Sequence, residues 1–426
     1  MRELRTLFVL ILASVLIVGA GFAVAFGQRA NLKGGSKSVG VRSAPSEPAP
    51  LDPFARKAEA ERARERAAGA SAGTAVDARS DAFATPTLQA GEGATDVLRL
   101  KDGRTFELVE TRLSGRTGVE GRLSDGGDPA RFSTSEVESL EIAVSTEFRR
   151  GLEAYDAGRL TGSDAELRQA LDRFQGARKS ARGRLEKEWA TAKIAETLQR
   201  LGRGDEAAAE FFLLCRLDPM TSFLSSAPLR WTLDASRGES YDPSASRHAE
   251  ALALEWIKPI DNPTGKANPS GRLLAASILL EFPSRRKEAQ EALRALATLE
   301  ASDDASHDEA ESARRIALLA IAQLWRLDAL GGPKASLVDR WTKTTELLPE
   351  SLRRDACGFV GLMELKLGRD EALRRVVRSA ASVADRDLAR ACGVAAADAC
   401  RRLGRAEEER ELRRRFGGSA TRGASF

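Results

Sequence analysis

The chain has 426 residues, of which 66 are basic and 62 acidic, so its formal net charge is only +4. This near balance argues against nucleic acid as a partner, because nucleic-acid-binding proteins carry clustered basic charge. Hydrophobic residues make up 42% of the chain and aromatic residues 5%. Such a composition permits buried cores in about two or three domains and favours helices rich in Ala, Leu and Arg.

The first feature along the chain is an uncharged apolar run, residues 7–26, which follows Arg2 and Arg5. A helix of this length spans about 30 Å, the thickness of a bilayer core. We predict that residues 1–27 form a transmembrane anchor or a signal peptide, and the length of the run favours the anchor. The basic start favours export of the rest to the periplasm, although basic residues after the run oppose that orientation.

The next segment, residues 28–94, consists mainly of Ala, Gly, Ser, Pro and charged residues. Pro45, Pro48, Pro50 and Pro53 cluster near its start. Such a composition cannot bury enough apolar surface to offset the entropy lost on folding. We therefore predict a disordered linker that gives the folded part reach from a membrane.

Strand patterns begin at Thr95, and Asp102-Gly103 separates the first two of them, which is a strong hairpin signal. A second turn is predicted over residues 125–129, and a single helical turn over residues 135–138. Five short strands predict a small closed all-β barrel over residues 95–145. The predicted strands are residues 97–100, 105–109, 118–123, 130–133 and 139–143.

This order of strands resembles the small Sm-like or Src-homology-like barrels that precede helical repeats in bacterial envelope proteins. The resemblance rests on Lys101-Asp102-Gly103 and on the final segment, residues 135–141. It implies a fold that often binds peptides or nucleic acid. Phe106 and Phe132 are the only aromatic residues of the segment, and we interpret both as core residues.

From residue 146 onward the pattern is helical, and the clearest unit is residues 188–219. Its first helix places small Ala195 at the predicted crossing, Leu201-Gly202 makes the turn, and Asp205 is the expected N-cap. Gly202, Ala207, Phe211 and Pro219 occupy the turn, small-residue, aromatic and closing-proline positions of a tetratricopeptide repeat. The unit therefore resembles that family, which implies an extended groove for a peptide or protein partner.

Weaker copies of the turn follow at Leu330-Gly331, Leu367-Gly368 and Leu403-Gly404. We predict a mainly α fold, an α-solenoid of degenerate repeats. Its expected parts are repeats over residues 146–221, an irregular insert or joint over 222–270, repeats over 271–416 and a disordered tail over 417–426. Burial of Trp231 and Trp256 is expected if the insert is a joint.

The sequence contains no recognisable catalytic or metal-binding motif. His248 and His307 lack a neighbouring nucleophile of the elbow type. The acidic run over residues 302–309 lacks the offsets of a cation loop, and we interpret it as a connector in which Ser306 or Ser302 caps the following helix. Cys392 and Cys400 lie about 12 Å apart on one predicted helix, too far for a disulfide. No catalytic, metal or cofactor residue is predicted.

The function expected from these patterns is a membrane-tethered, non-catalytic protein–protein scaffold. Two alternatives stay open at this point. One is an accessory or wall-binding subunit of an envelope enzyme complex, and the other is an RNA-associated factor that uses an Sm-like barrel. The partner, the residues that bind it and the oligomeric state are not set by the sequence.

Overall fold

The computed structural model describes residues 86–232, 243–259 and 267–416. The chain divides into two compact units, residues 1–76 and 77–426, and all the described residues belong to the second. The predicted anchor, most of the predicted linker and the predicted tail lie outside the described residues. In the described part, no helix is both long enough and apolar enough to cross a membrane.

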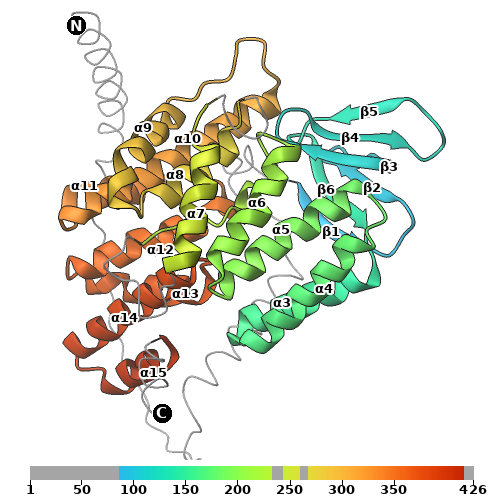
Figure 1. Cartoon of the computed structure of the whole chain (residues 1–426). Coiled ribbons are helices and arrows are strands. Elements are labelled where there is room, and N and C mark those ends of the chain that lie inside the picture. Colours follow the sequence, from blue (N-terminus) through green and yellow to red (C-terminus); the bar gives the residue numbers. More distant parts are fainter. Residues whose placement is uncertain (1–85, 233–242, 260–266, 417–426) are drawn as a thin grey trace, which may run out of the picture. The chain divides into compact units, whose positions relative to one another are not determined.

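Six strands open the described part and form one sheet (Figure 1), in the order β1-β6-β2-β3-β4-β5. The strands are β1 Thr87–Gly91, β2 Asp96–Leu100, β3 Thr105–Ser114, β4 Gly118–Leu123, β5 Pro129–Phe132 and β6 Val137–Ala143. β1 runs parallel to β6, and the other neighbouring strands are antiparallel. The sheet is open, since β1 and β5 form its two edges.

The predicted closed five-stranded barrel was therefore wrong. Its two glycine turns are confirmed, because Gly103 and Gly126 both have a positive φ of 89° between paired strands. The strand missed was β1, which pairs Thr87 with Ser139 across about fifty positions of sequence. A parallel pairing of such range leaves no local turn signal. The helical turn predicted before the last strand was also wrong, since β6 already begins at Val137.

Helices fill the rest of the described chain, and most consecutive ones pack as antiparallel pairs (Figure 1). They are α3 Thr146–Thr161, α4 Asp164–Lys179, α5 Arg184–Arg200, α6 Gly204–Leu217, α7 Pro243–Trp256, α8 Pro269–Leu279, α9 Arg286–Ala297, α10 His307–Asp328, α11 Ala335–Thr345, α12 Glu350–Lys366, α13 Leu373–Ser382, α14 Arg386–Arg402 and α15 Ala406–Phe416. The prediction that the chain is mainly helical is confirmed.

The hairpin predicted over residues 188–219 is present as α5 and α6. Ala195, Ala207 and Phe211 are fully buried, and Gly202 turns the chain with a φ of 77°. The predicted cap was wrong: α6 begins at Gly204, and Asp205 lies in its first turn. The cap position is Arg203, and the Asp205 carboxylate forms an ion pair with Arg230 at 2.8 Å.

The prediction of a single α-solenoid was wrong, because repeats of a solenoid contact only their neighbours. Arg200 of α5 donates to the backbone oxygens of Ser382 and Val383, 182 and 183 positions later in the chain. Trp231 donates its backbone N–H to Asp385, 154 positions later. These contacts link helices that are remote in sequence, so the fold is not a one-dimensional stack.

Two carboxylates dock the sheet on the helices. Asp218, just after α6, accepts a hydrogen bond from Gly115 N at 2.9 Å, and Asp308 of α10 accepts one from Thr134 N at 2.9 Å. A Cβ atom added at Gly115 would lie 1.6 Å from the backbone oxygen of Met220. Glycine is thus required where the β3–β4 turn meets the helices.

Candidate functional site

The residues considered for chemistry at the sequence level are dispersed in the structure. His248 is exposed on α7, and His307 is exposed at the first position of α10. Ser306 caps α10 as expected, and Asp308 from the acidic run is buried against the sheet. Among the described residues, no group of three or more His, Cys, Asp or Glu side chains is placed to hold a metal ion.

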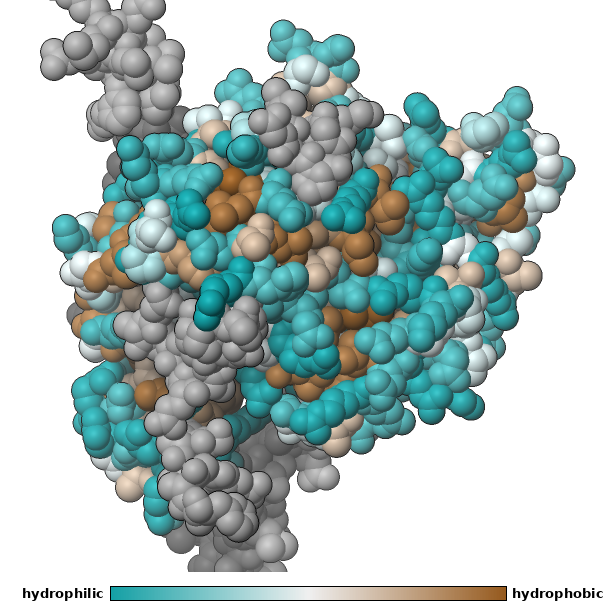
Figure 2. All heavy atoms as spheres, in the orientation of Figure 1, coloured by the Kyte–Doolittle hydropathy of each residue, from teal (hydrophilic) through white to brown (hydrophobic). Residues whose placement is uncertain are grey.

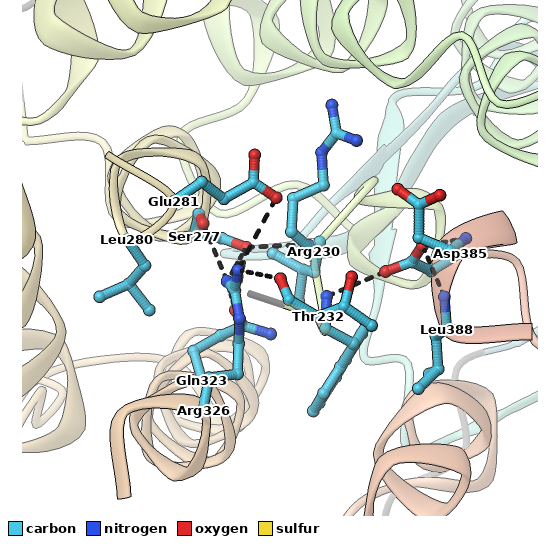
Figure 3. A network of polar contacts seen from close by, with 12 residues as sticks. Arg230, Thr232, Ser277, Leu280, Glu281, Gln323, Arg326, Asp385 and Leu388 are labelled. Carbon is cyan, nitrogen blue, oxygen red and sulfur yellow. Dashed lines mark hydrogen bonds and ion pairs between the residues drawn. The ribbon is translucent and has the colours of Figure 1, made fainter. Parts of the chain in front are cut away.

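The interior instead contains an irregular central segment, residues 227–232, to which several helices donate or accept hydrogen bonds (Figure 3). Trp231 and Trp256 are both buried, as predicted for a joint. The contacts of the central segment are Leu229 O with Gln199 Nε2 at 3.3 Å, Arg230 N with Ser277 Oγ at 2.9 Å, Trp231 N with Asp385 Oδ2 at 2.9 Å, and Thr232 O with Arg326 Nη2 at 2.9 Å. The segment therefore joins α5, α8, α10 and α14.

Arg326 is the buried cation of this network (Figure 3). Its Nη1 donates to Ser277 O and to Gln323 Oε1, each at 2.9 Å, while its Nη2 donates to Thr232 O. Glu281 lies 3.8 Å from the same guanidinium and is itself buried. Because a buried charge needs a partner and hydrogen bonds, this geometry holds α8, α10 and the central segment in one arrangement.

Asp385 is the buried anion on the other side of the central segment (Figure 3). It accepts hydrogen bonds from Trp231 N and from the backbone N–H groups of Asp387 and Leu388, so it also caps α14. Burial, together with the nearby charge of Asp387, raises the pKa of Asp385 to about 6. The N-terminus of α14 is therefore fixed to the interior by one titratable group.

A second, partly buried ion pair joins Lys193 and Glu196 on α5, with 2.8 Å between Nζ and Oε2. Burial alone would raise the pKa of Glu196, but Lys193 and a hydrogen bond from Ser226 outweigh it and lower that pKa to about 2. Tyr155 of α3 lies beside the pair, since Lys193 Nζ is 5.0 Å from the centre of its ring. These groups are satisfied by one another, which is typical of a structural network.

A groove lies next to these networks, where the helices at the start and end of the described part meet. One wall consists of the end of α3, the start of α4 and the end of α5, and the other of the end of α13, the start of α14 and the end of α15. Its volume is about 580 Å³, within the range of about 300–1,000 Å³ found for ligand sites. Glycine and alanine make up much of its lining.

The charged lining of the groove is mainly basic. It contains Arg159, Arg200, Arg386, Arg390 and Arg415, whereas the acidic residues are Asp164 and Asp387. The sequence pattern at residues 410–415 predicts a solvated helix face with ion pairs, and Arg159, Arg200, Arg386 and Arg390 were not singled out from the sequence. These arginines come from residues 159–200 and 386–415, and no local pattern indicates that these two segments meet.

Three comparisons complete the description of the site: no protein-family model matches the chain, and no curated protein or solved structure matches it. The resemblance of residues 188–219 to a tetratricopeptide repeat stays a prediction.

Proposed function

We propose that this protein is a non-catalytic protein-interaction scaffold and that its partner binds in the groove between the α3–α4–α5 wall and the α13–α14–α15 wall. The observation that carries the proposal is the groove itself, with a volume of about 580 Å³ and a polar lining. Its described lining holds arginine, aspartate, glycine and alanine but neither histidine nor cysteine. Such a lining offers guanidinium donors and room for close approach of a main chain, which supports a binding role.

The groove is preformed, which also supports a binding role. Arg200 donates to Ser382 O at 2.8 Å, and Arg386 donates to Leu201 O at 3.0 Å, so each wall holds the other at a fixed width. A site that is organised before its partner arrives loses less conformational entropy on binding.

The proposed location is the bacterial envelope, with the scaffold held at a membrane and exported. Its support comes from the sequence alone, namely the apolar run over residues 7–26, which lies outside the described residues. Fractionation of cells and protease protection of a C-terminal tag would test it. Recovery of the chain from the cytosolic fraction would contradict this location.

Site-specific photocrosslinking tests the binding role. A photoreactive amino acid replaces Ala381, an exposed residue of the groove lining, or Ser336, an exposed residue of α11, in otherwise identical chains. We expect a discrete protein adduct from the position in the groove and none of the same mass from the control. Identical adducts from both positions, or no adduct from the groove, would contradict the proposal.

A further inference from the structure

We infer that the groove binds an extended peptide segment of a partner protein, in which acidic side chains alternate with small apolar ones. This inference rests on the proposed function and adds the chemistry of the partner. Five arginines and two aspartates line the groove, so its own charges leave it positive. The guanidinium group is planar and donates two parallel hydrogen bonds, which matches a carboxylate.

The five arginines divide into two groups with different roles. Arg200 and Arg386 bridge the walls, since their guanidinium groups donate to backbone oxygens on the opposite wall. Arg159 pairs with Asp156 of its own helix at 3.4 Å. These three arginines build the frame of the groove.

Arg390 and Arg415 are the two arginines left for a ligand. Arg390 is exposed on α14, and within the part of the chain that the structure describes it forms no hydrogen bond or ion pair. Arg415 lies over the ring of Phe416, with its guanidinium carbon 5.3 Å from the ring centre. Both side chains have donors to offer a carboxylate, and both lie on the same wall.

The shape of the lining favours a main chain rather than a compact small molecule. Gly162 and Ala381 give no side chain, or only a methyl group, along the groove, and no atom lies within 4 Å of a Cβ added at Gly162, so a peptide backbone can approach closely. In an extended peptide, alternate side chains point to the same side and lie about 7 Å apart. Such a segment presents its carboxylates on one side, where the arginines of the groove can bind them, and its small side chains on the opposite side.

Nucleic acid fits the groove less well, although its phosphates would also attract arginine. Asp164 and Asp387 lie in the lining and would repel a continuous phosphate backbone. Single-stranded nucleic acid is bound by several stacked aromatic side chains, and Phe416 is the one aromatic residue in the described lining. The charge pattern therefore fits carboxylates placed at intervals.

Fluorescence anisotropy on the full chain tests the inference. The probe is a short fluorescein-labelled peptide of alternating Glu and Val, and the matched peptide has Gln in place of every Glu. We expect the Glu peptide to bind at least about tenfold more tightly, because charge-assisted hydrogen bonds contribute more than neutral ones. We also expect its affinity to fall as salt is added.

Two charge reversals locate the site. Arg390→Glu removes a donor from the groove and is expected to weaken binding of the Glu peptide by at least about tenfold. Arg340→Glu makes the same change of charge at an exposed position of α11, outside the groove lining, and is expected to leave binding within about twofold. Thermal melts of both variants would exclude loss of folding as the cause.

The remaining outcomes separate this inference from the proposed function. Equal binding of the Glu and Gln peptides, or equal effects of the two variants, would overturn the inference that the bound peptide is acidic. Photocrosslinks at position 381 would persist in that case, because they test only whether a protein binds in the groove. If a single-stranded oligonucleotide binds more tightly than the Glu peptide, and Arg390→Glu abolishes that binding, the ligand of the groove is nucleic acid and the peptide inference is wrong. If the photoreactive residue at position 381 forms no protein adduct in a chain that carries no arginine substitution, the proposed function itself is overturned.

Discussion

Replacement of Arg326 by methionine should destabilise the protein strongly. The guanidinium donates to Ser277 O, Gln323 Oε1 and Thr232 O, each at 2.9 Å, and lies 3.8 Å from Glu281. The Arg326→Met variant loses these bonds and removes a positive charge from beside the buried Glu281 carboxylate. Breaking a buried ion pair from one side typically costs about 3–5 kcal/mol, and we expect a loss of unfolding free energy in this range.

Urea unfolding followed by circular dichroism measures this loss. Arg340→Met, on the exposed face of α11, is the control and should change stability by less than about 0.5 kcal/mol. The double variant Arg326→Met with Glu281→Leu removes both charges and should lose less stability than the sum of the two single variants, because their mutual interaction is lost only once. A loss below about 1 kcal/mol in Arg326→Met, or a double variant as unstable as the sum of the singles, would refute the reasoning.

Three further predictions follow from buried positions. The pKa of Asp385 is raised to about 6 in the fold, above its value in the unfolded chain, so the folded state takes up a proton first as pH falls. The unfolding free energy of wild type, relative to that of Asp385→Asn, should therefore rise by up to about 3 kcal/mol as pH falls from about 7 to about 4. A flat difference across this pH range, measured by chemical unfolding, would contradict it. Gly115→Ala places a Cβ atom 1.6 Å from Met220 O and should lower the melting temperature by several degrees, whereas Gly176→Ala, where no atom lies within 4 Å, should not. Ala207→Trp should overpack the crossing of α5 and α6 and lose about 1–3 kcal/mol or more, and unchanged stability would contradict close packing there.

Local features of the fold could be predicted from the sequence. The turns at Gly103 and Gly202 were found because a positive φ selects glycine, and both positions have one. Most helical segments were found from their apolar period, although α7 lies inside the predicted irregular insert, and Ser306 was one of two serines expected to cap α10. Each of these features depends on residues within a few positions of one another.

Features that depend on distant residues were missed. The ion pair of Asp205 with Arg230 was not predicted, and the barrel prediction failed because β1 pairs with β6. The groove was missed for the same reason, since Arg386 and Asp164 are 222 positions apart. Charged residues on a helix have the same local pattern whether they face solvent or a distant wall.

The buried hydrogen-bond networks also position the walls of the groove. Asp385 accepts a hydrogen bond from Trp231 in the central segment and caps α14, and the following two turns of α14 carry Arg386 and Arg390 into the groove. Arg200, on the opposite wall, donates to the end of α13 just before that cap. The buried polar groups therefore set the position of the wall that bears the free arginine. Hydrophilic side chains cover the outward faces of α3 and α4 (Figure 2). The contacts that fix the position of this wall are therefore those in the interior and the hydrogen bonds across the groove.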